Sequence, residues 1–342
     1  MESLIFAFNA IMPIILLIVL GYILTKAGFL TDEFLKLGNK FVFNVALPAL
    51  LFINVYSIES FSDIDLSFVV YSLIVVSLFF LAGLLLVKLT IHDSKQKGVI
   101  LQCCFRSNYA IIGIPLAESL GGSAAVGAAA VLSAFSIPVY NMLAVIALTL
   151  YVTDEDGSSV STGTRIKKVL LNILKNPLII GVVVGMIALG IRSFIPVRPD
   201  GTYVFSLSGS LPFLFKAIKS LSSVATPLAL VILGGRFDFK TTSDSIREIL
   251  IGTIVRVIFV PLIALAGAVL LSRYTSLVNF DSTVYPALVA LFGTPVAVSS
   301  AIMAEQMKND GKLAAQLVVW TSLLSILTIF IEVVILRNLG LL

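Results

Sequence analysis

The stretch FRSNYAIIGIPLAESLGG, residues Phe105–Gly122, decides the fold. It lies in a strongly apolar part of the chain, yet it contains Arg106, Asn108, the triplet Gly113-Ile114-Pro115 and Glu118. These residues are unexpected in a helix that only crosses lipid, because a charge is costly in a bilayer and a proline removes a backbone hydrogen-bond donor. The stretch therefore predicts an interrupted membrane helix that faces protein or water.

The composition is that of an integral membrane protein. Of the 342 residues, 58% are hydrophobic and 12% are charged, and the mean hydropathy is +1.08. Such a chain cannot present water with an ordinary polar surface. Its apolar runs are continuous and reach the length of about 20 residues that a helix needs to cross a bilayer, which favours helices over a β-barrel. The first run lacks the basic flank of a signal peptide and is interpreted as a true span.

Ten apolar runs are separated by polar segments. The predicted spans are residues 4–26, 38–57, 67–91, 98–120, 123–152, 170–191, 211–235, 246–272, 283–306 and 312–337. The segment 153–169 divides them five and five, so we predict a first five-helix repeat at 1–152 and a second at 170–342. If loops alternate sides, most of the 23 lysines and arginines fall on one side. The positive-inside rule then puts the 153–169 connector in the cytoplasm and both termini outside.

The two halves share landmarks in the same order, although they enter the membrane from opposite sides. NVALPALLF in the second span matches SVATPLALV in the seventh, and GIPLAES in the fourth span matches GTPVAVS in the ninth. Inverted repeats with helices broken at matching positions are typical of secondary transporters. We therefore predict two inverted five-helix repeats, with helices four and nine broken at Gly113-Ile114-Pro115 and Gly293-Thr294-Pro295 and crossing near the midplane.

The two predicted breaks supply the candidate binding residues. An unwound segment persists in a membrane only where it packs in protein or lines a hydrated cavity, and the N-terminus of a half-helix favours a bound anion. Asn108 is the leading ligand, because its amide donates and accepts hydrogen bonds without carrying a charge. The full set of predicted substrate-binding residues is Asn44, Arg106, Asn108, Gly113, Ile114, Pro115, Asn141, Gly293, Thr294, Pro295 and Ser299.

Two arginines inside the spans each allow two interpretations. Arg106 could bind a substrate carboxylate with both of its terminal nitrogens, or it could neutralise Glu118 or Glu305. Arg256 in the eighth span poses the same choice, with structural pairing favoured. The position of the nearest carboxylates distinguishes the two interpretations.

The motifs of several other protein classes do not occur in the sequence. It has no GxxxxGK[ST] motif, no His/Cys cluster, and no nucleophile with an accompanying base. We therefore expect neither an enzyme nor an ATP-driven pump, and no metal or cofactor apart from a coupling sodium ion or proton. Of the acidic residues, only Glu118, Glu305 and Glu332 fall within spans or at their ends, which disfavours a carboxylate-based proton relay at the breaks. A nucleic acid partner is not expected.

With these motifs, the chain resembles the auxin efflux carrier family, which includes plant PIN-formed carriers and bacterial malate and malonate permeases. The resemblance covers nearly the whole chain and rests on SNYAIIGIPLAES, NVALPALLF, KNPLIIGVVVG, IPVYNMLAV and FGTPVAVSSAIMAEQM. It implies an all-α membrane fold of ten helices, similar to that of sodium/proton antiporters and bile-acid symporters. The family's crossover prolines map to Pro115 and Pro295, and its polar asparagine maps to Asn108.

The resemblance also implies that the helices form two units, a scaffold and a transport unit. Spans one, two, six and seven would form a scaffold, which commonly makes a homodimer. Spans three to five and eight to ten would form a transport unit that moves like an elevator. The short 153–169 connector indicates a bacterial-type member, since many plant carriers have a long cytoplasmic loop.

The predicted function is secondary transport of a small organic anion across the cytoplasmic membrane. Candidate substrates are mono- or dicarboxylates such as malate, malonate or an auxin-like acid. Two alternatives stay open: a sodium- or proton-coupled symporter of the same fold for another organic anion, and a transporter-like membrane sensor.

Overall fold

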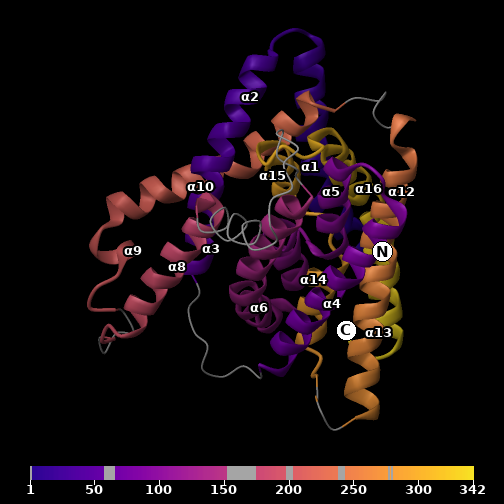
Figure 1. Cartoon of the computed structure of the whole chain (residues 1–342). Helices are drawn as coiled ribbons and strands as arrows, with labels where there is room; N and C mark the ends of the chain where they lie inside the picture. The colour runs from indigo at the N-terminus through magenta and orange to yellow at the C-terminus, as the bar shows by residue number, and fades with distance from the viewer. Residues whose placement is uncertain are drawn as a thin grey trace, which may run out of the picture.

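The structure is a computed structural model, and it describes residues 2–57, 66–151, 175–197, 203–237, 243–275, 278 and 280–342. The regular secondary structure of these residues is helical (Figure 1). The β interactions among them are two isolated bridges, Ser107–Val296 and Val197–Tyr203. The predicted all-α class is therefore confirmed for the described residues, whereas the predicted connector at 153–169 lies outside them.

In the described residues, the first half of the chain runs from α1 to α6. Its elements are α1 (Glu2–Lys26), α2 (Asp32–Phe41), η1 (Val42–Ala46), α3 (Leu47–Tyr56), α4 (Ser67–Thr90), α5 (Ser94–Phe105), η2 (Tyr109–Gly113) and α6 (Ile114–Leu150). The second apolar helix begins at Asp32 rather than at residue 38, because Thr31 accepts the backbone N–H of Phe34 and caps it. Within α6, Gly122 has φ of 64° and ends one helix before the next begins, where the sequence separates its fourth and fifth spans.

The second half has the same kinds of elements. They are α8 (Pro177–Ser193), α9 (Leu207–Ser210), α10 (Pro212–Gly235), α12 (Ile246–Ile254), η3 (Val255–Phe259), α13 (Val260–Tyr274), α14 (Val284–Gly293), α15 (Ser299–Gln306) and α16 (Gly311–Asn338). Asn176 and Asp310 cap the starts of α8 and α16 with their side-chain oxygens.

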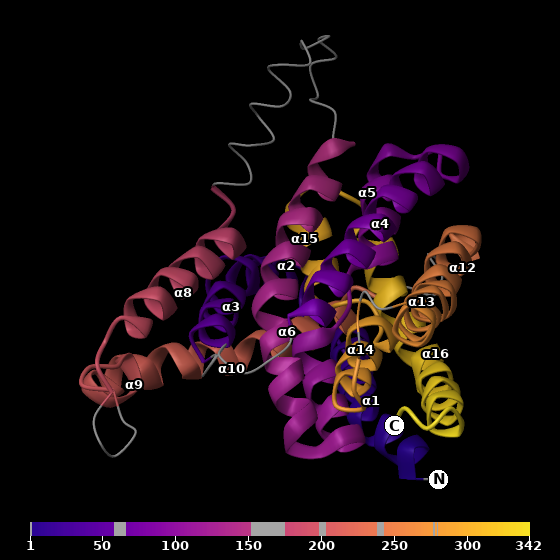
Figure 2. The same cartoon turned by 90° about the horizontal axis from the view of Figure 1, so that it is seen from below.

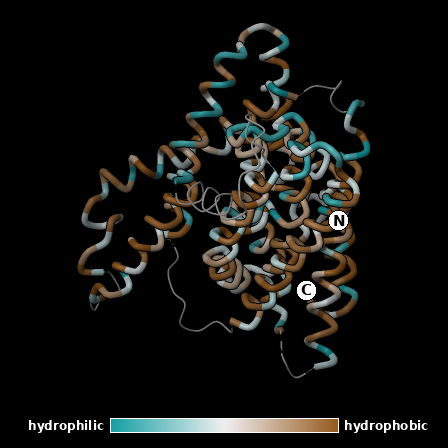
Figure 3. Tube along the Cα trace, in the orientation of Figure 1, coloured by the Kyte–Doolittle hydropathy of each residue, from teal (hydrophilic) through white to brown (hydrophobic). Residues whose placement is uncertain are grey.

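Apolar residues cover most of the length of these helices (Figure 3). Among the described residues, six helical runs are long and apolar enough to cross a membrane, and three further apolar helices are shorter. The six are Asp32–Tyr56, Ser67–Thr90, Ala125–Leu150, Pro212–Gly235, Ile246–Tyr274 and Gly311–Asn338. The fold is thus that of a multi-pass membrane protein, and ten spans in two inverted repeats stay a prediction.

Three π-helical segments each end two residues before a proline. The segments η1, η2 and η3 are followed by Pro48, Pro115 and Pro261. A proline ring clashes with the carbonyl four residues earlier and offers that carbonyl no N–H. The wider π turn moves this carbonyl aside, so the helix passes the proline without unwinding.

The helices form two groups on either side of α6. Helix α3 packs on both α8 and α10, and the three helices lie to one side in two perpendicular views (Figures 1 and 2). On the other side, α4 packs on α5, α12 packs on α16, and α14 packs on α6 and α16. Helix α14 is central to the second group, since all of its residues from Val284 to Gly293 are buried. The candidate site lies where the two groups meet.

Candidate functional site

Two segments that interrupt helices meet inside the protein. The first, Arg106–Asn108, separates α5 from η2, and the second, Thr294–Val298, separates α14 from α15. Ser107 and Val296 form an antiparallel bridge, and the Asn108 N–H donates to the Pro295 carbonyl at 2.8 Å. The sequence therefore correctly pairs the fourth and ninth helices as broken and in contact.

The position of the first break corrects the sequence prediction. Gly113 and Ile114 have helical backbone angles, and Pro115 lies in the first turn of α6, so the triplet does not unwind the helix. The π turn described above accommodates this proline. The second break lies where predicted: Thr294 is extended, with ψ of 151°, directly after Gly293.

A cavity opens beside the crossing, between the two groups of helices. Most of its wall is apolar side chains and backbone, and its polar side chains are few, as in typical small-molecule sites. The lining residues come from α3 (Leu47, Leu50, Leu51, Asn54), the first break and η2 (106–111), α6 (Ile137, Tyr140, Asn141), α8 (Leu178), α10 (Ala225, Thr226, Ala229) and the second break with the start of α15 (Ala297, Val298, Ser299).

Arg106 is a buried cation held by neutral groups on the cavity wall. The residue is only 3% exposed, and Nη2 donates to Asn141 Oδ1 at 2.9 Å and to Ser299 Oγ at 2.8 Å. Nη1 donates to Gln102 Oε1 and contacts the sulfur of Met303. In the part of the chain that the structure describes, no carboxylate forms an ion pair with Arg106.

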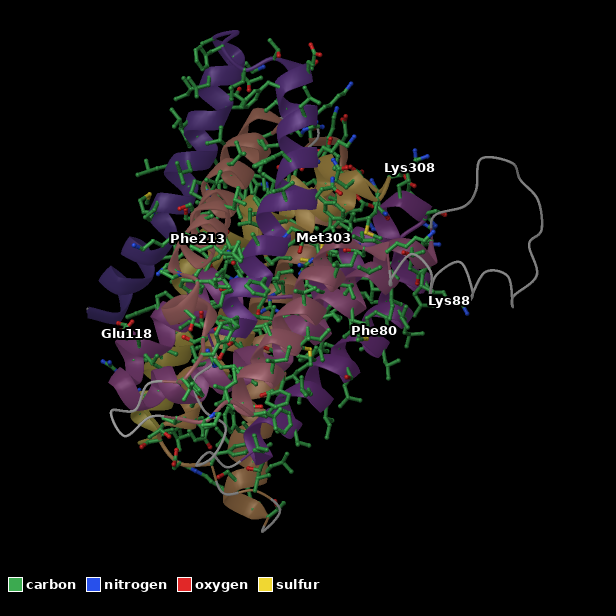
Figure 4. All side chains as sticks on the ribbon, turned by 90° about the vertical axis from the view of Figure 1, so that its left-hand side faces the viewer. Phe80, Lys88, Glu118, Phe213, Met303 and Lys308 are labelled. Carbon is green, nitrogen blue, oxygen red and sulfur yellow. The ribbon has the colours of Figure 1, made fainter. Side chains whose placement is uncertain are left out.

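Both proposed counter-ions of Arg106 lie elsewhere. Glu305 forms a salt bridge with Arg236, which joins α15 to the end of α10. Glu118 is exposed and lies at the edge of the protein, well away from Met303 beside Arg106 (Figure 4). The interpretation of Arg106 as a neutraliser of Glu118 or Glu305 is therefore wrong.

Several donors at the first break lack acceptors. The Nδ2 of Asn108 is buried, and no described residue accepts a hydrogen bond from it. The backbone N–H groups of Tyr109, Ala110 and Ile111 begin a helix at the cavity wall, and none of them has an acceptor among the described residues. Such unpaired N–H groups carry the positive end of the helix dipole. An anion in the cavity would meet them together with Arg106.

The structure brings together four of the predicted binding residues: Arg106, Asn108, Asn141 and Ser299 line one cavity. The other seven, which do not line it, are Asn44, Gly113, Ile114, Pro115, Gly293, Thr294 and Pro295. Asn44 is exposed and donates to the Lys40 carbonyl of its own helix. A Cβ at Gly113 would lie 3.0 Å from the Ala290 carbonyl, so this glycine lets η2 approach α14 closely.

Arg256 has a structural role at the second break. Its side chain is fully buried, and Nε and Nη2 donate to the carbonyls of Leu291, Phe292 and Thr294 at 2.8 to 3.2 Å. These carbonyls end α14 and have no partner within that helix, so the guanidinium satisfies the negative end of its dipole. Of the two interpretations of Arg256, the structure supports structural pairing.

Sequence reasoning missed several polar residues of the site. Gln102 lies one helical turn before Arg106 and orients its guanidinium, while Ser107 donates to the Tyr140 hydroxyl at 3.3 Å. Asn54 and Thr226 line the opposite wall, from α3 and α10. The spacing of Gln102 and Arg106 on one helix face is the one signal that the sequence offers. Among the described residues, no group of three His, Cys, Asp or Glu side chains could hold a metal ion.

Comparison with known proteins gives a consistent picture. A family model described as membrane transport protein matches residues 6–332. An uncharacterized transporter of Methanocaldococcus jannaschii is 25% identical over 94% of this chain and 96% of its own length. An uncharacterized transporter of Methanothermobacter thermautotrophicus is 23% identical over 94% of this chain and 95% of its own length.

Proposed function

Because this chain belongs to the membrane transport protein family, as its resemblance to the auxin efflux carriers implies, we propose that it carries a small organic anion across the cytoplasmic membrane. The observation that carries this proposal is the buried Arg106 on the wall of the cavity, held by neutral partners. A buried cation without a counter-charge is costly. A carboxylate entering the cavity supplies that charge.

The site fits a carboxylate attached to a small apolar or polar skeleton. The carboxylate accepts hydrogen bonds from the Arg106 guanidinium, from the Asn108 amide and from the open N–H groups at the start of η2. Leu50, Leu51 and Ile137 contact the carbon skeleton. The candidate substrates are mono- and dicarboxylates such as malate, malonate or an auxin-like acid. Such mixed sites, mostly apolar with a few convergent polar groups, are typical of small-molecule binding.

The arrangement of the helices supports an alternating-access mechanism. We assign ten spans in two inverted repeats, with a scaffold of spans one, two, six and seven and a transport unit of spans three to five and eight to ten. The cavity has walls from both parts, since α3, α8 and α10 belong to the scaffold and both breaks belong to the transport unit. An elevator-like movement of the transport unit along the scaffold then exposes the cavity to each side in turn. The scaffold forms a homodimer, and both termini are extracytoplasmic.

Uptake by purified protein in liposomes tests this function. The vesicles are offered labelled malate, malonate and an indole carboxylate, with protein-free vesicles as the blank. We expect saturable uptake of at least one of these anions. Uptake of none of them, with the protein folded and reconstituted, contradicts the proposal.

We expect Asn108→Ala to raise the KM for the transported anion about fivefold to tenfold, because a hydrogen bond of this kind contributes about 1 to 1.5 kcal/mol. The matched control is Asn44→Ala, since Asn44 is also a membrane asparagine but bonds only its own helix. Initial rates of uptake against anion concentration measure both variants. An unchanged KM in Asn108→Ala, or the same increase in Asn44→Ala, would remove Asn108 from the site.

A further inference from the structure

Glu332, in α16, is a buried acidic residue with no role in the site described so far. Both of its carboxyl oxygens are buried, and neither has a hydrogen-bond partner among the described residues. It lies against the second break, because a Cβ built on Gly293 would fall on its Oε2 and 3.2 Å from its Cδ. The sequence disfavours an acidic group at the breaks, and the tertiary structure places one there.

Arg256 and this carboxyl both lie at the second break. Among the described residues, Arg256 is the charged group that acts electrostatically on Glu332. Its Nη1 is buried and has no hydrogen-bond partner there. The other titratable groups around Arg256 are the neutral thiols of Cys103 and Cys104 in α5 and the hydroxyl of Tyr140 in α6. The carboxyl and the Nη1 of Arg256 are thus both buried without a hydrogen-bond partner among the described residues.

Two states of this pair follow from its surroundings. A carboxylate without hydrogen bonds in a dry interior has lost its hydration, so the unbonded arrangement suits the neutral acid. A deprotonated Glu332 needs the Nη1 of Arg256 as its partner. Arg256 donates a hydrogen bond to the Thr294 carbonyl, so a movement of Arg256 toward Glu332 displaces this carbonyl. The neighbouring carbonyl, that of Pro295, accepts a hydrogen bond from the Asn108 N–H at the cavity. The proton on Glu332 is therefore linked mechanically to the cavity.

An electrostatic link acts in the same direction. A bound anion and a deprotonated Glu332 are like charges in a medium of low dielectric, so each disfavours the other. Binding of the anion therefore favours the protonated acid, and by reciprocity the protonated acid favours the anion. We propose that Glu332 is the proton-binding residue of this carrier and that the anion moves together with one proton. This inference rests on the proposed function.

The test is uptake of labelled malonate, or of whichever anion the transport screen identifies, into liposomes with the membrane potential clamped at zero. With the outside one pH unit more acidic, a solute that moves with one proton accumulates about tenfold. We expect this accumulation in the wild type and its loss in Glu332→Gln, which imitates the neutral acid and still exchanges labelled for unlabelled anion across the membrane. The matched control Glu118→Gln, an exposed acid at the edge of the protein, keeps the tenfold accumulation. Accumulation retained in Glu332→Gln overturns the proposal.

Two measurements keep the inference separable from folding defects and from the proposed function. At a pH where the carboxyl is deprotonated in the absence of anion, wild-type protein in weakly buffered detergent solution takes up about one proton per bound anion, and uptake of none at that pH overturns the proposal without any variant. The infrared C=O band of a protonated carboxyl is followed against pH in the absence of any anion. If this band titrates in the wild type and is missing in Glu332→Gln, the proton site stands even where no anion is transported. An unchanged band in Glu332→Gln overturns it.

Discussion

Replacing Arg106 by glutamine is expected to weaken anion binding by about 10- to 100-fold. Each hydrogen bond from a charged group to a carboxylate contributes about 1.5 to 3 kcal/mol, and glutamine loses both the charge and the fork of donors. Asn141 and Ser299 hold the guanidinium in place, so little binding free energy is spent on ordering it, and a bound carboxylate takes over part of the hydrogen bonding that these neutral partners provide. Arg106→Lys keeps the charge but not the planar fork, and an intermediate effect is expected.

Titration of the transported anion into detergent-solubilised protein, followed by the shift in its thermal unfolding, measures this effect, because a ligand of the folded state raises the apparent Tm. The matched control is Arg273→Gln. Arg273 lies at the exposed end of α13 and bonds only the Leu339 carbonyl. Equal anion affinity in wild type and Arg106→Gln would show that the anion binds elsewhere.

Gly234→Ala and Gly21→Ala are each expected to lower the free energy of unfolding by about 1–3 kcal/mol, the range for overpacking a tight interface. Helices α1 and α10 touch backbone to backbone: a Cβ at Gly234 would fall on the carbonyl oxygen of Ile18, and a Cβ at Gly21 on that of Val231. A carbonyl cannot rotate away as a side chain can, so the two helices must separate. In lipid, small residues let helix backbones approach closely and gain van der Waals contact, and separating α1 from α10 loses that contact.

The control for this pair is Gly190→Ala in α8. No atom lies within 4 Å of the position that a Cβ would take at Gly190, so the substitution brings only the better helix propensity of alanine, up to about 1 kcal/mol. The Tm of Gly190→Ala should equal or exceed that of the wild type, while the two interface variants melt lower. The same Tm in Gly234→Ala and Gly190→Ala would contradict the close contact of α1 and α10.

The helices themselves were largely predictable from the sequence. Lipid demands long apolar runs with internal hydrogen bonds, and such runs can be read without knowing their neighbours. The boundaries that changed are those set by a polar residue: Thr31 caps the second helix six residues earlier than hydropathy indicates. The effect of Pro115 on the helix also differs from the prediction. Pro115 is typical of an unwound break, but a π turn absorbs it, and the break falls seven residues earlier at Asn108.

The candidate site was predictable only in part. Arg106, Asn108 and Ser299 were found because they are polar residues near the two predicted breaks, and Asn141 because it is a rare amide in an apolar run. The partners of the arginines were not predictable, since a charge in the sequence carries no distance to its counter-charge. Glu305 was a candidate partner for Arg106, yet it pairs with Arg236 of α10.

By itself, the sequence determined that this is a helical membrane protein, because the length and polarity of each run are local properties that the bilayer selects directly. Only the tertiary structure decided what the FRSNYAIIGIPLAESLGG stretch does. Arg106 lies beside neutral partners at a cavity, and Arg256 donates to the carbonyls at the end of α14. The carboxyl of Glu332 contacts Gly293, which is 39 positions away in the chain. Those outcomes depend on how helices distant in sequence cross, and packing between helices, unlike hydropathy, is not encoded in any one of them.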